Sequence, residues 1–197
     1  WDKLKHGTSI YAVLWNQDMR HGTGDIDIRP VDMLSFYWEP GIQDIQESKN
    51  IFVLSLQDND SLEHQYPELV GKLSGTTIDR KQYHYDDTVD TTEKSIVVDW
   101  YYKVKIENGT QVHLVKYCGD TVLFASENDP AYENGIYDHG QYPFVMDVLY
   151  PEKGTPAGFG IIDVEKDAQE YIDRLGAAII INAEEGATRR YFAKDNC

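Results

Sequence analysis

The chain has little cysteine and few basic residues, and each shortage argues against a class of function. Its two cysteines, Cys118 and Cys197, lie far apart and form neither a CxxC pair nor a zinc-ligand spacing. Lys and Arg number 18 against 34 Asp and Glu, which gives a net charge of −16. Tight binding to a nucleic-acid backbone needs clustered Lys and Arg, so the composition argues against it. No apolar run approaches the roughly 20 residues of a membrane-crossing helix, and we expect no membrane association.

The chain also lacks the motifs that metal binding, phosphate binding and catalysis usually need. His64 has no second histidine four residues away, and His113 and His139 are expected on a strand and in a loop. Asp58 opens a calcium-like loop that has Glu63 where Gly is required. The glycine-rich turn 154–160 has neither the Lys of a phosphate loop nor the third Gly of a dinucleotide loop. We therefore expect a protein that is not an enzyme and that has no catalytic residue, no cofactor and no metal.

What the sequence does contain is a series of short β-rich runs separated by turn residues. Aromatic residues make up 12% of the chain, and such residues favour strands. The alternation of polar and apolar residues in 24–29 predicts a half-buried strand. The full set of predicted strands covers residues 8–15, 24–29, 34–38, 51–56, 96–106, 112–118, 121–125 and 142–150.

A few helical signals interrupt these strands. Residues 1–7 are typical of a helix end, with basic side chains in the last turn and Gly at the C′ position. Asp60 and Glu63 are spaced as a capping box that begins a short helix. Pro67 ends that helix and can open a second short turn. The polar stretch 74–94 is predicted to be a loop or an exposed insertion.

The longest predicted strand, 96–106, returns through a turn at Asn108-Gly109. A two-residue turn places Val104 opposite His113 and mixes the two faces of the hairpin. A three-residue loop, with Gly109 left-handed, places Val104 opposite Val112 instead. Because a slip of one residue exchanges the faces of a strand, we predict the three-residue loop.

The last part of the chain predicts one long amphipathic helix after the Pro/Gly-rich turn 151–160. The helix is expected to run from Ile161 to about Glu185, with an i,i+4 ion pair between Glu170 and Arg174. Apolar residues of this helix recur at helical spacing: Val164, Ala168, Tyr171, Ile172, Leu175, Ala178 and Ile179.

No later segment of the chain can pack along this helix. We therefore expect its partners in other subunits or in further sequence. Gly176, which costs about 1 kcal/mol relative to Ala inside a helix, either lets a neighbouring backbone approach closely or is a tolerated kink. Because the chain opens inside a helix without Met and stops abruptly, we expect it to be a piece of a longer protein.

The order of these predicted elements resembles that of the portal proteins of tailed bacteriophages and prophages. The similarity is one of extended pattern over most of the chain, apart from the insert 74–94, because portals have no short catalytic signature. The stretches that carry it are Gly7-Thr8-Ser9-Ile10-Tyr11-Ala12-Val13-Leu14-Trp15, residues 24–28, 36–46 and 58–67, Gly140-Gln141-Tyr142-Pro143-Phe144 and Gly158-Phe159-Gly160.

The resemblance implies a fold of α+β class, with an antiparallel β-rich wing domain followed by a stem helix. Residues 1–158 correspond to the wing, 159–188 to the first stem helix and 189–197 to the start of the clip. The residues expected to form the subunit contacts and the channel helix are Val164, Ala168, Tyr171, Ile172, Leu175, Gly176 and Ile179.

The same resemblance implies a structural role in the virion. Portals form a homo-oligomeric ring, usually a dodecamer, at one vertex of the capsid, and double-stranded DNA passes through it during packaging and ejection. They assemble in the host cytoplasm with capsid and scaffold proteins, dock the terminase and later bind head-completion proteins. An acidic wall keeps DNA from adhering, and no sequence-specific contact is expected.

Two other readings remain open from the sequence. The chain is also compatible with a β-rich carbohydrate- or protein-binding module of a larger protein, with the aromatic runs 36–38 and 100–101 as its contact face. Aromatic residues that alternate along strands are more often core residues. The third possibility is an enzyme fragment whose catalytic residues lie elsewhere.

Overall fold

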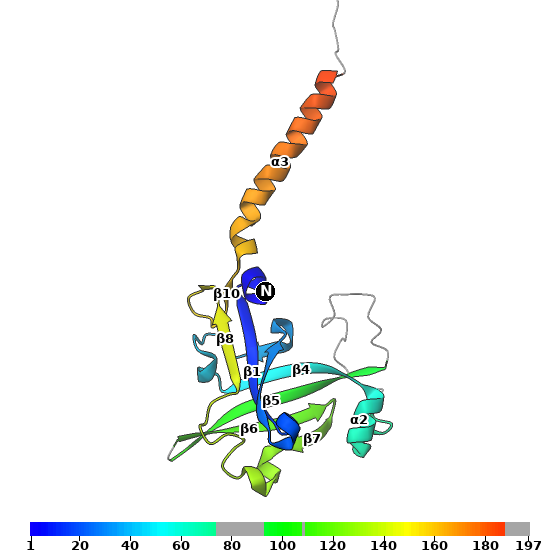
Figure 1. The fold of residues 1–197 in the computed structure, drawn as a ribbon, viewed down its shortest axis with the longest axis vertical. Helices are drawn as coiled ribbons and strands as arrows, with labels where there is room; N and C mark the ends of the chain where they lie inside the picture. The colour runs from blue at the N-terminus through cyan, green and yellow to red at the C-terminus, as the bar shows by residue number, and fades with distance from the viewer. Residues whose placement is uncertain (74–92, 108, 188–197) are drawn as a thin grey trace, which may run out of the picture.

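The computed structural model describes residues 1–73, 93–107 and 109–187. Within them the chain has the α+β fold that was predicted: antiparallel sheets of three, five and two strands, and a long C-terminal helix. The three-stranded small sheet has the order β2-β1-β8, and the five-stranded large sheet has the order β3-β4-β5-β6-β7. The helix α3 (Ile161–Ala187) projects away from both sheets (Figure 1).

The strands fall close to the predicted ranges. The small sheet consists of β1 (Thr8–Asn16), β2 (Asp25–Val31) and β8 (Phe144–Val148), and the two-stranded ribbon pairs β9 (Tyr150–Pro151) with β10 (Gly158–Phe159). The large sheet consists of β3 (Phe36–Trp38), β4 (Asn50–Asp58), β5 (Lys94–Ile106), β6 (Gly109–Cys118) and β7 (Thr121–Ala125). The predicted insertion 74–94 lies outside the described residues except for its last two, and of these Lys94 opens β5.

The remaining elements are short helices. The α-helices α1 (Asp2–His6) and α2 (Asn59–Gln65) were both expected. The 3-10 turns are η1 (Arg20–Gly22), η2 (Met33–Ser35), η3 (Ile45–Glu47), η4 (Pro67–Leu69), η7 (Ser126–Asn128) and η8 (Pro130–Tyr132). Pro67 opens η4 as predicted. The capping prediction for α2 was wrong, because Asp58 is the N-cap and Asp60 lies inside the first turn.

The predicted register of the β5–β6 hairpin was also wrong. Ile106 pairs with Gly109, so Val104 lies opposite Gln111 and Lys103 lies opposite Val112. Neither register considered from the sequence has this pairing. The hairpin therefore places Lys103 on the same face as the buried Val112, and this lysine finds polar partners there.

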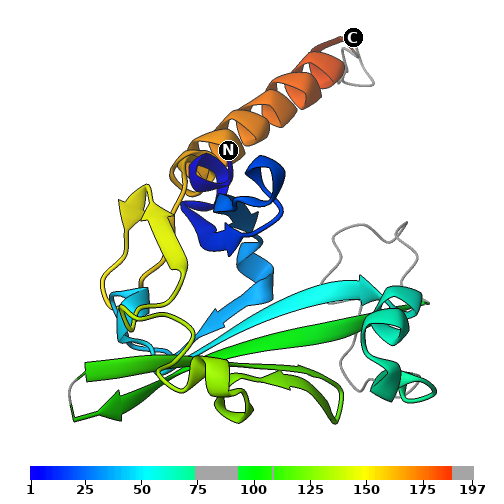
Figure 2. The same cartoon turned by 60° about the horizontal axis from the view of Figure 1, so that its bottom comes forward.

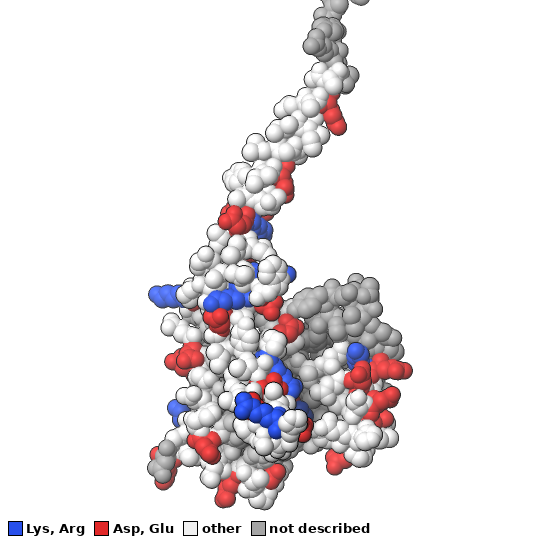
Figure 3. Space-filling view, viewed as in Figure 1, with Lys and Arg blue, Asp and Glu red and all other residues white. Residues whose placement is uncertain are grey.

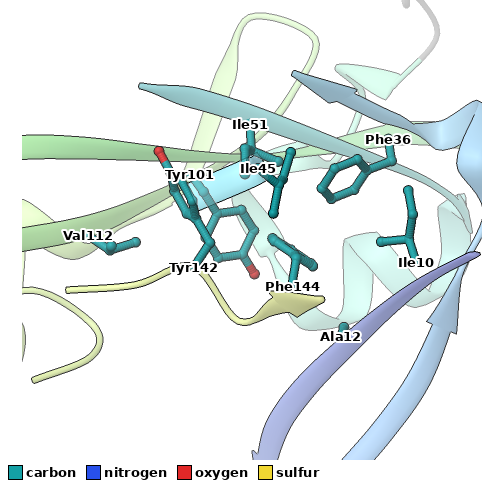
Figure 4. Packing of buried hydrophobic residues seen from close by; sticks show 9 residues of the cluster. All are labelled: Ile10, Ala12, Phe36, Ile45, Ile51, Tyr101, Val112, Tyr142 and Phe144. Carbon is teal, nitrogen blue, oxygen red and sulfur yellow. The ribbon is translucent and has the colours of Figure 1, made fainter. Parts of the chain in front are cut away.

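The main core lies between the small sheet and one face of the large sheet, which we call the inner face. Ile10 and Ala12 of β1 and Phe144 of β8 meet residues from β3, β4, β5 and β6 (Figure 4). Phe144 makes edge-to-face contacts with the rings of Phe36 and Tyr101, each at 5.0 Å between centroids. The buried members of this core are Ile10, Ala12, Phe36, Ile45, Ile51, Tyr101, Val112, Tyr142 and Phe144.

A second, smaller core lies under α2 at the other end of the large sheet, which Figure 2 shows well separated from the small sheet. Leu62 of α2 and Leu69 of η4 pack there against Val97 and Cys118. Between the two cores the sheet carries the ion pair of Asp99 and Lys116, with 3.2 Å between Oδ1 and Nζ. Burial raises the pKa of the Asp99 carboxyl, and the Lys116 ammonium offsets part of that increase.

Gln46 joins the two parts of the main core. Its side-chain amide donates to the carbonyl oxygens of Tyr142 and Phe144, at 3.1 Å and 3.3 Å, and its oxygen accepts from the Tyr142 N–H at 2.8 Å. The Tyr142 hydroxyl donates in turn to the carbonyl oxygens of Ser48 and Lys49. The stretches 36–46 and 140–144, far apart in the sequence, are thus bonded to each other.

Replacing Gln46 by Ala should lower the free energy of unfolding by about 2–6 kcal/mol, because four part-buried hydrogen bonds of its side chain, one of them donated by the Lys103 ammonium, are lost at roughly 0.5–1.5 kcal/mol each. Chemical denaturation measures this. Gln43→Ala is the matched control, since Gln43 is exposed in the same connection. Equal effects of the two substitutions would contradict the role given to Gln46.

The small sheet differs from prediction in one way. The predicted strand 142–150 is divided into β8 and β9, and β8 pairs with β1. In β2, which was predicted to be half-buried, Ile26 and Ile28 are exposed. Their side chains lie on the face of the small sheet that is turned away from the main core.

An exposed apolar helix as the candidate functional site

The helix α3 begins where the predicted Pro/Gly-rich turn ends. The Asp163 side chain accepts a hydrogen bond from the Gly160 N–H at 3.0 Å, which satisfies one of the donors that every helix start leaves open. A carboxylate in the first turn also interacts favourably with the helix dipole. The start of α3 is therefore fixed by local sequence.

The base of α3 is held by close backbone contact with the end of α1. A side chain at Gly160 would overlap the Lys5 carbonyl, and a side chain at Gly7 would overlap the backbone of Phe159. Gly7 also has φ +80°, and its carbonyl accepts from the Leu149 N–H at 2.8 Å. This contact, which we call the α1–α3 junction, sets the direction in which α3 leaves the sheets.

Beyond the junction, no residue of α3 is buried against the described part of the chain. Its 27 residues extend about 40 Å at 1.5 Å per residue. Tyr171, Leu175 and Ile179 are 63–67% exposed. The helix therefore carries its apolar stripe in the open, as the sequence predicted.

The structure places each predicted site residue on this helix. Val164, Tyr171, Ile172, Leu175 and Ile179 are exposed large apolar side chains, Ala168 is exposed, and Gly176 is partly covered. At 3.6 residues per turn they share one side of α3, and Ala178, also exposed, lies beside it. We call these seven residues, of which Gly176 is one and Ala178 is not, the apolar stripe.

A second apolar side was missed from the sequence. Ile180 and Ile181 are 60% and 54% exposed, and at about 100° per residue the midpoint of this pair lies on the other side of the helix from the midpoint of Leu175 and Ile179. The sequence signal was present, because residues 175–183 contain no charged side chain. A helix that is apolar all round is normally enclosed by protein or lipid.

Charged side chains of α3 concentrate toward its base and its far end, and Figure 3 shows much of the visible helix surface uncharged. Glu170 and Arg174 form the predicted ion pair, with 3.6 Å between Oε2 and Nη2. Two basic residues, Lys166 and Arg174, stand against seven acidic ones: Asp163, Glu165, Asp167, Glu170, Asp173, Glu184 and Glu185. The helix thus combines an acidic character with two apolar sides.

A groove of about 910 Å³ lies at the base of α3, between α1, the ends of β1 and β2, and η2. Apolar Leu34 and Ile162 line it, and both are exposed. Three carboxylates, of Asp2, Asp32 and Asp163, line it together with the single lysine Lys5. The groove is therefore more acidic than basic, and it adds apolar surface beside the base of the helix.

The buried histidine on the large sheet does not form a catalytic pair. His113 Nδ1 lies 3.1 Å from the hydroxyl of Ser126, and this hydroxyl also accepts from the Leu114 N–H at 3.0 Å. Ser126 is fully buried, so no substrate reaches its oxygen. Within the described residues, no group of three His, Cys, Asp or Glu side chains is arranged to hold a metal ion.

The aromatic residues of the large sheet are arranged against one another. On the face opposite the inner face, Phe52 stacks on Trp100 with ring centroids 5.9 Å apart and planes 14° apart. Trp100 lies 4.8 Å from Tyr102, and Tyr102 stacks on His113 at 5.6 Å. Sugar binding uses open ring faces, whereas Phe52, Trp100 and Tyr102 are partly buried and each has a neighbouring ring against it. Tyr101 of the predicted pair 100–101 lies on the other face, in the main core.

Asp99 gives the chain a pH-dependent contribution to stability. Because burial raises its folded-state pKa, the folded chain binds a proton here more readily than the unfolded chain does. Between the unfolded-state pKa near 3.8 and the raised folded-state value, stability from this group should therefore increase as the pH falls.

Asp99→Asn should remove this contribution. Denaturation between neutral and mildly acidic pH should show the wild type gaining stability relative to the variant as the pH falls. The comparison of the two proteins cancels the general effect of the acidic surface. A relative loss of stability on acidification would mean that Lys116 lowers the Asp99 pKa overall.

In comparisons with known proteins, no family model matches the chain and no curated protein matches it. Among the helices in the described ranges, none has both the length and the apolar character to cross a membrane.

Proposed function

We propose that the chain is the wing and first stem helix of a ring-forming portal protein, similar to those of tailed bacteriophages. The observation that carries the proposal is α3, a 27-residue helix without a buried residue, which has the apolar stripe along one side and apolar residues on its other sides within the uncharged segment 175–183. Copies of the same helix are the partners that best satisfy both sides. The protein is then a structural component of the virion, assembled in the bacterial cytoplasm.

Two opposed apolar sides favour a ring over a simple dimer. In a symmetric dimer each copy uses one and the same patch, whereas a closed ring uses two different patches on every copy. The apolar stripe around Leu175 and the side formed by Ile180 and Ile181 supply two such patches. A side chain added at Gly176 would meet nothing in its own chain, so space remains there for a neighbouring helix.

The acidic character of the chain suits a conduit for DNA. With a net charge of −16 it repels a phosphate backbone, so DNA passes without binding tightly. The proposed partners are other copies of the chain, the terminase, and the head-completion, capsid and scaffold proteins. Double-stranded DNA passes through the channel without contacts that recognise its base sequence. A β-rich binding module is the second candidate, but it leaves α3 without a role, and the stacked rings around Trp100 offer no open platform.

Negative-stain electron microscopy of the complete gene product that contains this chain, purified under reducing conditions, tests the proposal. Dodecameric rings with a central hole would support it and would make α3 the channel-forming helix. Uniform monomers or dimers would overturn it and would favour the binding module.

A further inference from the structure

The small sheet turns an apolar face toward solvent. Antiparallel pairing places Trp15 opposite Ile26, Val13 opposite Ile28, and Tyr11 opposite both Pro30 and Val145. Trp15, Ile26 and Ile28 are 61%, 57% and 63% exposed. We call the set Tyr11, Val13, Trp15, Ile26, Ile28, Pro30 and Val145 the outer face of the small sheet.

The patterning of β2 is the reverse of what a solvent-facing strand normally has. Its charged residues Asp25, Asp27 and Arg29 lie on the face turned toward the molecule, and its two isoleucines lie on the face turned away. Asp27 is bonded within the sheet to Arg29 at 2.6 Å and to Asn16 at 3.4 Å. A contiguous exposed apolar surface of this kind marks an interaction site.

The outer face is also nearly free of charge. None of its seven residues is charged, and the next residue of β8 on the same side is Asp147, which lies opposite Ser9. Lys3 of α1 neutralises it, with 2.6 Å between Nζ and Oδ1. On a chain with a net charge of −16, copies repel one another over most of their surface. A neutral apolar face is the place where they can meet.

We propose that a second copy of this chain covers the outer face of the small sheet. The proposal rests on the ring proposed for α3. Lys3 ties α1 to β8, and Gly160 packs against Lys5 of α1, so the small sheet, α1 and the base of α3 form one continuous body. When α3 lies beside the α3 of a neighbouring copy, the sheets of the two copies come side by side as well.

Photocrosslinking tests whether a second copy covers the outer face. The photoreactive amino acid p-benzoylphenylalanine replaces Ile28 in the complete gene product. Covalent dimers of the chain should form on illumination. The matched control replaces Val122 of β7, which is 54% exposed on an edge strand of the large sheet, and should give no dimer. Electron microscopy of the same samples reports ring formation separately.

The outcomes distinguish the two proposals. Dimers from position 28 support the inference, whether or not the particles are rings. Rings without dimers from position 28, or crosslinks only to other proteins, overturn the inference and leave the ring proposal intact. Ile28→Glu should weaken self-association at least tenfold, and Val122→Glu should not. An unchanged assembly of Ile28→Glu would also overturn the inference.

Discussion

Leu175→Glu should abolish ring assembly and leave the fold of the chain unchanged. Leu175 lies at the centre of the apolar stripe and is 63% exposed, so its replacement removes no contact from the chain itself. The free energy of unfolding of the chain should change by no more than about 0.5 kcal/mol, as for other surface substitutions. In a ring the same carboxylate would be buried without a partner in every subunit, which costs several kcal/mol per copy.

Electron microscopy and sedimentation velocity of the complete gene product measure the loss of rings, and circular dichroism checks that the helix persists. Gln169→Glu is the matched control, because it adds the same charge on the polar side of the same helix. That variant loses a hydrogen bond from Gln169 to Asp173 and gains a like-charge pair, at a cost of about 0.2–0.5 kcal/mol. Undiminished rings from Leu175→Glu would place the subunit contacts elsewhere.

The parts of the fold that the sequence predicted are those determined by local interactions. The end of α1 at Gly7, the turn at Pro67 and the course of α3 each depend on neighbours within a few residues. Beyond the α1–α3 junction, no other element of the described chain packs against α3. The apolar spacing of α3 therefore follows helical periodicity alone and could be recognised from the sequence. The residues of the apolar stripe therefore lie along one side of α3, as their spacing predicted, and their role in subunit contacts stays a prediction.

The errors arose where a distant segment decides the outcome. Lys103 lies opposite Val112 because the Gln46 backbone carbonyl, at 2.6 Å, accepts from its ammonium and the Tyr142 ring lies beneath it at 4.4 Å. No local pattern indicates such partners, so a register chosen to match apolar residues was wrong. Burial lowers the pKa of Lys103, which agrees with its place against the core.

The same reasoning explains the outer face of the small sheet. Alternation in β2 predicts which residues share a face, but it does not say which face meets the core. The usual assumption buries Ile26 and Ile28, and the pairing of β1 with β8 leaves them exposed. The second side of α3 was missed for a related reason, because Ile180 and Ile181 fall outside a single stripe. Both omissions concern apolar surfaces that the chain does not cover by itself.

The second large effect is expected from a substitution at the α1–α3 junction. Gly7→Ala should lower the free energy of unfolding by roughly 2–5 kcal/mol, combining about 1–2 kcal/mol for a left-handed residue with about 1–3 kcal/mol for the overlap with Phe159. Two further variants measure the two costs separately. Gly154 has φ +88° and open space around it, so Gly154→Ala measures only the free-energy cost of a side chain on a left-handed backbone.

Gly160→Ala measures the free-energy cost of steric overlap at the junction, because a side chain at this position would overlap the Lys5 carbonyl. Denaturation of the three variants should place Gly7→Ala near the sum of the other two. In the complete gene product, Gly7→Ala and Gly160→Ala should also disturb the ring, since both change the angle at which α3 leaves the small sheet. Gly154→Ala should leave ring assembly intact. If Gly7→Ala destabilises the chain no more than Gly154→Ala does, the backbone contact between α1 and α3 does not fix the direction of the helix.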